Sequence, residues 1–508
     1  MPKIYEYNTE AVDNLFSEHS LYENREKLAR FTSKEYKSEV TICISMYKDL
    51  DKAKRCVESV LRYTKGIDFD LVLLIDGPKD GLFDYFKNIE YEKTTIIYNT
   101  ANRGGSVPWT FLSMDMLSEF VVGLAGDLVL TENWLNNLLK CIKSDPTTGM
   151  VVPVSSNSSN LQEYYIGDFK NYDEMQKLAS DFNRSDPGKW EERLRIITLG
   201  TVFRKSALYT LGIPMSDIGF AHNFSDDEMA FRMRRMGYKC IVAADTWIHH
   251  DHVRTVTTLE EKNEFDRSIE IGRQDFKNKY FGIDAWIDVN NFVLFRDKIQ
   301  KTGSDIPAIL GIDVKCGTPI LDIKNKIRQF GKLNAGCFAI TSDPKYYTDL
   351  MTICGAEQVV CGDVVQSIDK FVPSSMDYII IDKYINQYQD PFGLITKCAT
   401  LLKNDGHIYV YLKNSYDLLS YLDMLGYITD NRTEMAYNYT YSQFVKKVKD
   451  MGGNIECVLT EKLTADEAGG VAPIGEKLLQ KTINMSNDPQ GKVDRIMTRR
   501  WAFDITLG

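Results

Sequence analysis

The sequence predicts an α/β protein built from two mostly parallel sheets in two successive domains. Its 508 residues exceed what a single hydrophobic core usually serves. Short apolar segments rich in β-branched residues alternate with helical segments in two separate series, one from residue 40 and one from about residue 306. Continuous apolar strands separated by helices are typical of a parallel sheet covered on both faces.

The two series of strands place the domain boundary near residue 300. We expect strands over 40–46, 70–76, 94–99, 121–127 and 149–154 in the first series, and over 307–314, 334–341, 358–363, 376–382, 407–412 and 454–460 in the second. Residues 1–37 are polar and helix-prone, which indicates a helical lead-in. The predicted organisation is therefore a lead-in over 1–37, a first domain over 38–300 and a second over 301–508.

Composition excludes several classes of protein. With 44% hydrophobic and 26% charged residues the chain is globular rather than disordered. A formal net charge of -10 disfavours nucleic acid as a partner. The ten cysteines form no C-x-x-C pair, which favours reduced thiols over zinc sites. Neither a leader peptide nor an apolar run of about 20 residues is present, so we expect a cytoplasmic protein without a transmembrane segment.

Polar motifs follow several strands of the first domain. In open α/β sheets ligands bind where the strands end, so these positions are candidates for a binding site. Asp76 ends one strand and Asp127 another, and an N-R-G-G-S turn over 102–106 would let a ligand approach the backbone closely.

An acidic group opens a helix further along the chain. Ser225-Asp226-Asp227-Glu228 reads as a capping box, in which hydroxyl and carboxylate satisfy the free amides of the first turn. An ionised carboxylate at this end of a helix could accept a proton from a hydroxyl. Taken alone, such a motif more often only begins a helix.

Three of the six histidines fall within four residues, at 249–252, where another predicted strand ends. Imidazole beside carboxylate is a common ligand set for a divalent cation. Together with Asp127, His249 or His250 therefore forms a candidate metal site.

These motifs, in this order, resemble the GT-A fold of family 2 inverting glycosyltransferases over about residues 38–285, most specifically over 225–250. The resemblance implies a nucleotide-sugar-binding domain that transfers a hexosyl or N-acetylhexosaminyl group to an acceptor hydroxyl. It places the catalytic base at Asp226, with Asp227 and Glu228 beside it, and the metal on Asp127 and His249 or His250. The residues implied in donor binding are Ser45, Tyr47, Asp76, Asn102, Gly104, Gly105 and Asp127.

The chain departs from the family pattern at several positions. The family's Asp-x-Asp metal motif is Ala125-Gly126-Asp127 here, and Pro78 replaces the serine of the acidic turn. The implied mechanism is a single displacement in which Asp226 removes the acceptor's proton while a divalent cation, Mn²⁺ or Mg²⁺, stabilises the leaving diphosphate.

The second domain resembles class I methyltransferases over about 306–505, which implies a Rossmann-like methyltransferase fold. Those enzymes bind S-adenosylmethionine against a Gly-x-Gly-x-Gly turn, but here Lys315 stands at its first glycine and Pro319 at its third. Acids remain at Asp313, Asp343 and Asp363. Because lysine and proline cannot reproduce a glycine backbone without a shift, we expect a degenerate domain that does not bind S-adenosylmethionine. Its role would be acceptor recognition, dimerisation or packing.

Two other functions stay open at this point. One is a bifunctional glycosyltransferase and methyltransferase acting on a surface glycan, and the other is a non-catalytic carbohydrate-binding scaffold. By analogy with similar two-domain enzymes, the acceptor is a protein or glycan, with the Ser/Thr hydroxyls of a bacterial surface protein such as flagellin as the leading expectation. The expected donor is a UDP-sugar such as UDP-N-acetylglucosamine.

Overall fold

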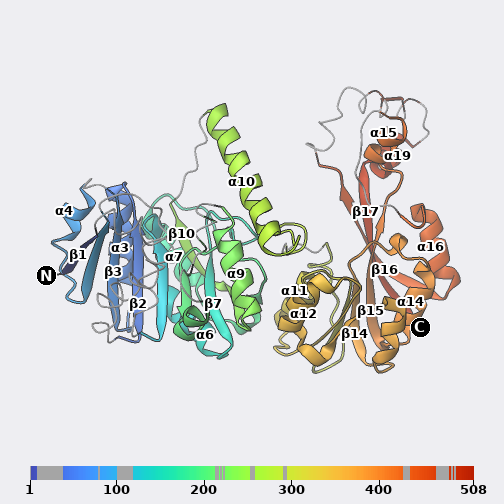
Figure 1. Cartoon of the computed structure of the whole chain (residues 1–508), viewed down its shortest axis with the longest axis horizontal. Helices are drawn as coiled ribbons and strands as arrows, with labels where there is room; N and C mark the ends of the chain where they lie inside the picture. Colours follow the sequence, from blue (N-terminus) through green and yellow to red (C-terminus); the bar gives the residue numbers. More distant parts are fainter. Residues whose placement is uncertain are drawn as a thin grey trace. The chain divides into compact units, whose positions relative to one another are not determined.

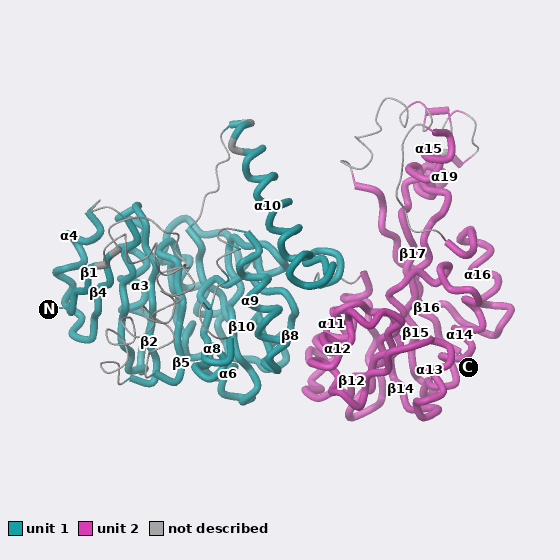
Figure 2. The backbone as a smooth tube through the Cα atoms, viewed as in Figure 1, with its two compact units in different colours: residues 1–291 teal, residues 292–508 magenta. Residues whose placement is uncertain are grey.

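The computed structural model describes residues 2–7, 38–77, 81–99, 118–211, 215, 217, 220, 223–251, 258–289, 294–426, 435–464, 477, 480–481, 484 and 488–507. The chain forms two compact units, Met1–Asn291 and Phe292–Gly508 (Figure 2). The junction lies slightly before the predicted boundary near residue 300. None of the described helices has the length and apolar composition needed to cross a membrane.

Unit 1 is built on one large mixed sheet with the order β1-β4-β3-β2-β5-β9-β7-β10-β6, and β8 pairs with β10 (Figure 1). Neighbours from β1 to β5 are parallel, as are β7 and β10, whereas β9, β6 and β8 run antiparallel to their partners. The strands are β1 (Lys3–Tyr7), β2 (Val40–Met46), β3 (Phe69–Asp76), β4 (Thr94–Asn99), β5 (Phe120–Ala125), β6 (Leu128–Val129), β7 (Thr148–Ser155), β8 (Trp190–Glu192), β9 (Thr201–Arg204) and β10 (Lys239–His250).

The lead-in prediction is wrong for the residues that can be described. Lys3–Tyr7 form β1, which pairs in parallel with β4 at the edge of the sheet. Residues 8–37 lie outside the described residues. Polar and apolar side chains alternate in Lys-Ile-Tyr-Glu-Tyr, as they can in a strand. This segment forms a strand and not a helix because it pairs with β4, which lies far away in the sequence.

Two apolar layers cover the faces of this sheet. One contains buried residues of α3 (Leu50–Tyr63), α4 (Leu82–Phe86) and α6 (Trp134–Lys143), and the other contains residues of α7 (Tyr172–Phe182), α8 (Lys205–Leu211) and α9 (Ser225–Arg235). Strands β2, β3 and β7 are buried almost throughout, which explains their continuous apolar sequences. Helix α10 (Leu259–Lys279) follows β10.

Unit 2 is a Rossmann-like α/β domain with a seven-stranded sheet of order β13-β12-β11-β14-β15-β17-β16. All neighbours are parallel except β17, which inserts antiparallel between β15 and β16. The strands are β11 (Ala308–Ile312), β12 (Gly336–Thr341), β13 (Val359–Cys361), β14 (Met376–Ile381), β15 (Leu402–Lys413), β16 (Gly453–Lys462) and β17 (Thr498–Leu507). The helices are α11 (Thr318–Gln329), α12 (Tyr347–Cys354), α13 (Val364–Ser367), α14 (Pro391–Ala399), α15 (Leu418–Met424), α16 (Tyr441–Asp450) and α19 (Pro489–Met497).

Candidate active site

The turn between β5 and β6 brings Asp127 to the carboxyl end of the sheet. Gly126 donates its N–H to the carbonyl of Ser45, at 2.9 Å, where β2 ends. A Cβ at Gly126 would lie 3.1 Å from that carbonyl oxygen and 3.4 Å from Met46 Cγ. Only glycine fits this approach without a shift, which gives the Ala-Gly-Asp sequence a structural reason for its second residue.

Strand β10 carries the two histidines to the same place. His249 pairs with Val129 and His250 with Leu128 of β6, and the N–H of Asp251 donates to the carbonyl of Asp127 at 2.9 Å. Because adjacent strand residues point to opposite faces, only one imidazole can face Asp127. That residue is His250, whose Nε2 lies 3.4 Å from Asp127 Oδ2.

The second ring nitrogen of His250 fixes the orientation of the imidazole. Nδ1 lies 2.8 Å from the carbonyl oxygen of Asn157, which can only accept, so Nδ1 carries a hydrogen and Nε2 is left to face the carboxylate. Burial lowers the pKa of His250, but its hydrogen bonds to Asp127 and Asn157 outweigh burial and raise the pKa overall.

His249 has a different environment. Its Nδ1 lies 2.8 Å from Ser156 Oγ, and its ring contacts those of Phe169, Tyr172 and Trp247. Burial lowers the pKa of His249. The structure therefore brings Asp127 together with His250, and His249 packs among aromatic rings.

The geometry of the Asp127–His250 pair is compatible with a shared cation. Two adjacent ligands of an octahedral Mg²⁺ or Mn²⁺, each at about 2.1 Å, are about 3 Å apart, close to the 3.4 Å separation here. Among the residues that the structure describes, no three His, Cys, Asp or Glu side chains gather as a preformed metal site.

The acids of α9 differ in their surroundings. Asp226 is partly buried and its Oδ1 accepts a hydrogen bond from Thr198 Oγ1. Burial raises its pKa to about 6, and the neighbouring Asp227 carboxylate adds to the rise. Asp227 is buried, pairs with the guanidinium of Arg195, and also has a raised pKa because of burial.

Glu228 is held as a structural carboxylate. It is fully buried, with Arg232 Nε at 2.9 Å, Lys279 Nζ at 2.5 Å and the Tyr280 hydroxyl at 2.8 Å. These contacts attach the end of α10 to α9. The predicted capping box is wrong, because Phe224 is the N-cap of α9 in a left-handed conformation and Glu228 faces these partners instead.

The segment 195–200 connects the two groups of residues. Thr198 contacts Asp226, and a Cβ at Gly200 would lie 2.8 Å from Ile248 Cδ1 on β10. Gln162 holds this segment by two hydrogen bonds to the backbone of Ile197. The acids of α9 and the end of β10 are thus anchored to the same stretch of chain.

Some predicted donor-binding residues can be placed and others cannot. Ser45 lies in β2 next to Ala125 of β5, Tyr47 follows that strand with 44% of its surface exposed, and Asp76 is buried at the end of β3. Asn102, Gly104 and Gly105 lie outside the described residues, as does Pro78.

Sequence reasoning missed the residues that orient this site. Ser156 and Asn157 follow β7 directly and contact the histidines; the rule that sites lie where strands end could have identified them. Arg195 and Thr198 lie outside regular elements and carried no comparable signal.

Unit 2 has its own cleft at the carboxyl ends of β11, β12 and β14, with a volume of about 540 Å³. Lys315 lines it in a left-handed conformation with φ 53°, which glycine would adopt without strain. Pro319 lies in the first turn of α11, where a missing N–H is tolerated. This corrects the expectation that Pro319 disturbs the turn.

The three predicted acids of unit 2 form local hydrogen bonds. Asp313 accepts from the Ser342 N–H at 2.7 Å and from the Tyr388 hydroxyl at 2.8 Å. Asp343 and Asp363 each cap the short helix that follows their strand.

Unit 1 is therefore an α/β domain with polar side chains gathered where its strands end. Residues 41–210 match the family model described as Glycosyl transferase family 2. The matched segment lies within unit 1, and the protein is a glycosyltransferase that uses a nucleotide-sugar donor. No curated protein matches the chain.

Several solved structures resemble parts of the chain. The mannosyltransferase PcManGT from Pyrobaculum calidifontis, in complex with GDP-Man and Mn²⁺, is 15% identical with a TM-score of 0.33, over 49% of this chain and 69% of its own. GalNAc-T7 with UDP, GalNAc and Mn²⁺ is 16% identical with a TM-score of 0.34, over 48% of this chain and 49% of its own. The YcgJ protein from Bacillus subtilis is 13% identical with a TM-score of 0.27, over 42% of this chain and 94% of its own. The chain thus spans about half the length of GalNAc-T7.

Proposed function

We propose that the protein inverts configuration at the transferred sugar in one displacement, with Asp226 as the catalytic base. The observation that carries this proposal is the partly buried Asp226 carboxylate at the start of α9, whose pKa is raised to about 6. A base with this pKa is about nine-tenths ionised at pH 7 and yet takes up a proton more readily than an exposed aspartate.

Thr198 and Arg195 set the orientation and the pKa of the Asp226 carboxylate. The Thr198 hydroxyl orients one oxygen of Asp226, and the other oxygen would accept the proton of the acceptor hydroxyl. Arg195 neutralises Asp227 and lowers the pKa of Asp226, which keeps Asp226 from being protonated near neutral pH.

Asp127 and His250 would hold a divalent cation together with the donor diphosphate. When bound, such a cation stabilises the negative charge that develops on the leaving group. The hydrogen bond from Nδ1 to Asn157 leaves Nε2 available as the ligand atom. Since His249 contacts Ser156 and aromatic rings, we assign the imidazole ligand to His250.

A comparison of the two adjacent histidines tests this assignment. Binding of Mn²⁺ in the presence of UDP can be followed by the loss of the free-ion paramagnetic resonance signal. We expect His250→Ala to weaken Mn²⁺ binding about tenfold or more, because a direct ligand is lost, and His249→Ala to retain it. Equal effects of the two variants would contradict the assignment to His250. Activity that survives complete removal of metal by EDTA would show that side chains alone neutralise the diphosphate.

For unit 2 we propose a methyltransferase-like domain that does not use S-adenosylmethionine. The strand order with a reversed β17 supports the fold, and Lys315 in the cofactor-side turn supports the loss of cofactor binding. The domain would serve acceptor recognition.

The finer identity of donor and acceptor is also a proposal. UDP-N-acetylglucosamine is the proposed donor, and a serine or threonine of a bacterial surface protein such as flagellin is the proposed acceptor. Release of nucleoside diphosphate from a panel of UDP-, GDP- and dTDP-sugars identifies the donor. If a GDP- or dTDP-sugar is turned over in place of the UDP-sugars, the proposed donor is wrong.

A further inference from the structure

A second cavity of unit 2, of about 450 Å³, lies where β15 ends. Its walls come from the residues after β15, from α15, from the start of α16, from α19 and from β17. Helices α15 and α19 pack together through Leu418, Leu422 and Ile496 (Figure 1). None of its lining residues lines the cleft at the ends of β11, β12 and β14.

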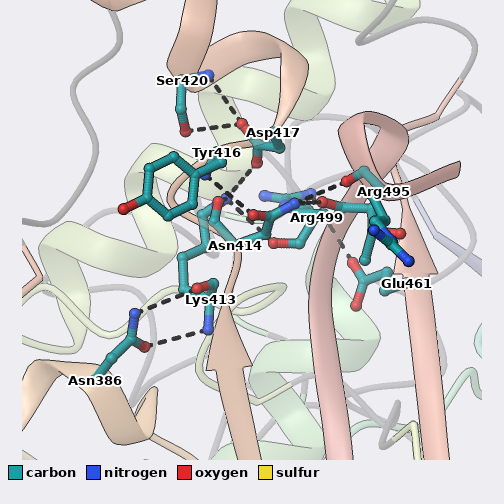
Figure 3. Close-up of polar contacts among 10 residues, drawn as sticks. Asn386, Lys413, Asn414, Tyr416, Asp417, Ser420, Glu461, Arg495 and Arg499 are labelled. Carbon is teal, nitrogen blue, oxygen red and sulfur yellow. Dashed lines mark hydrogen bonds and ion pairs between the residues drawn. The ribbon is translucent and has the colours of Figure 1, made fainter. Parts of the chain in front are cut away.

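The floor of this cavity is fixed by the side chain of Asn414 (Figure 3). Its amide nitrogen donates to the carbonyl oxygens of Arg495, at 2.9 Å, and Thr498, at 2.7 Å, and its Oδ1 accepts the N–H of Tyr416 at 3.0 Å. A single side chain therefore connects the residues after β15 to the end of α19 and positions Tyr416.

A buried ion pair stabilises the same turn. Lys413 Nζ lies 2.5 Å from Asp417 Oδ2, and the two residues are 7% and 0% exposed. Asp417 also accepts two hydrogen bonds from Ser420, and Asn386 pairs with both backbone groups of Lys413 (Figure 3). These contacts hold the turn in one conformation before a ligand binds, which favours binding because less conformational entropy is lost.

Aromatic rings form much of the cavity wall. Tyr416 and Tyr421 line it with 47% and 44% of their surface exposed. Deeper in, the rings of Tyr441 and Trp501 are 5.7 Å apart. Exposed aromatic rings in a cavity are a favourable surface for a flat apolar face, and their polar edges can form hydrogen bonds.

The charged side chains among the described residues that line the cavity are cations. Lys492 and Arg495, three residues apart on α19, both line it, and no described lining residue is acidic. Neither side chain forms an ion pair with any residue that the structure describes. In a protein with a net charge of -10, a cavity whose described charged residues are both cations favours an anionic ligand.

We propose that this cavity binds an anionic sugar, with its ring against Tyr416 and Tyr421 and its carboxylate or phosphate on Lys492 and Arg495. A sugar ring has an apolar C–H face that fits an aromatic wall and hydroxyls that fit a polar rim. The choice of a carbohydrate rests on the proposed glycosyltransferase function. The site would hold an acidic sugar that the acceptor already carries, apart from the reacting hydroxyl.

Titration calorimetry of the full chain with simple probes tests the proposal. Methyl glucuronide and glucose 6-phosphate carry the two candidate anions on the same kind of ring, and methyl glucoside lacks a charge. We expect at least one anionic probe to bind about tenfold or more tightly than methyl glucoside. The double variant Lys492→Gln/Arg495→Gln should reduce that binding about tenfold or more, because charge-assisted hydrogen bonds are lost.

Controls separate this site from the donor site. Lys446→Gln, an exposed change on α16 outside the cavity lining, should bind the probe like the unmodified protein. UDP binding to unit 1 should be the same in all variants. Absence of UDP binding would contradict the proposed glycosyltransferase function and would leave the test of this cavity unaffected. If the double variant unfolds, Tyr421→Ser provides a second test, because Tyr421 is exposed and lines the cavity; it should also weaken binding of the probe.

Three outcomes would overturn the proposal. They are the absence of binding by both anionic probes, equal binding by the double variant, and tighter binding of AMP than of either sugar, which would assign the cavity to a nucleotide.

Discussion

Replacing Asp226 by asparagine tests the proposed base through stability as well as rate. Burial raises the pKa of Asp226 from 3.8 to about 6, so the folded state binds this proton more tightly than the unfolded state. A rise in pKa of about two units means that the ionised Asp226 carboxylate lowers the free energy of unfolding by about 3 kcal/mol at pH 7. Asparagine has no charge to bury and retains an oxygen for the Thr198 hydroxyl.

The sign of the effect follows from the raised pKa. The contribution of Asp226 to wild-type stability falls as pH rises from about 4 to about 6, because the fold opposes ionisation of this carboxyl. We expect Asp226→Asn to be more stable than the wild type by about 1–3 kcal/mol at pH 7, and this gain to vanish below about pH 4. Its turnover should fall by about 10²-fold or more, since no group remains to accept the proton.

Urea unfolding at several pH values and a pH profile of kcat/KM measure both effects. The wild-type profile should fall about tenfold per pH unit below about pH 6. Asp173→Asn is the matched control, because Asp173 lies in the first turn of α7 and is exposed; it should change neither quantity. Near wild-type turnover in Asp226→Asn would refute the assignment, and the proton would then have to go to Asp227.

The other predictions concern the neighbours of this base and unit 2. Glu228→Gln should lower the free energy of unfolding by about 3–5 kcal/mol in urea titrations, because Arg232 and Lys279 lose their buried partner; wild-type stability with reduced turnover would instead indicate catalysis. Arg195→Met should move the acid limb of the pH profile upward, since Arg195 lowers the pKa of Asp226, and an unchanged limb would contradict that influence. Calorimetric titration of unit 2 within the full chain should show no micromolar binding of S-adenosylmethionine or S-adenosylhomocysteine, whereas a micromolar dissociation constant would restore the bifunctional alternative.

Buried parallel strands could be predicted from the sequence, whereas the antiparallel insertions could not. The predicted strands at 40–46 and 94–99 coincide with β2 and β4, because strands inside a covered parallel sheet are rich in apolar and β-branched residues. The sequence did not predict strand β17. Two arginines follow its first residue, Thr498, and its pairing with β15 and β16 depends on segments far away in the sequence. Pairing between distant segments cannot be predicted from local composition.

The candidate site shows the same limit at the level of single side chains. Asp226, Asp227 and Glu228 are consecutive, and in the sequence analysis only the resemblance to family 2 glycosyltransferases singled out Asp226 as the base. Their different surroundings come from residues distant in the chain, with Thr198 on Asp226, Arg195 on Asp227, and Lys279 and Tyr280 on Glu228. Burial raises the pKa of Asp226 toward the range of a useful base, and the side chain that contacts it is a hydroxyl rather than a cation. Sequence can therefore locate the acidic cluster, but only the packing of 195–198 and α10 against α9 separates a candidate base from a structural ion pair.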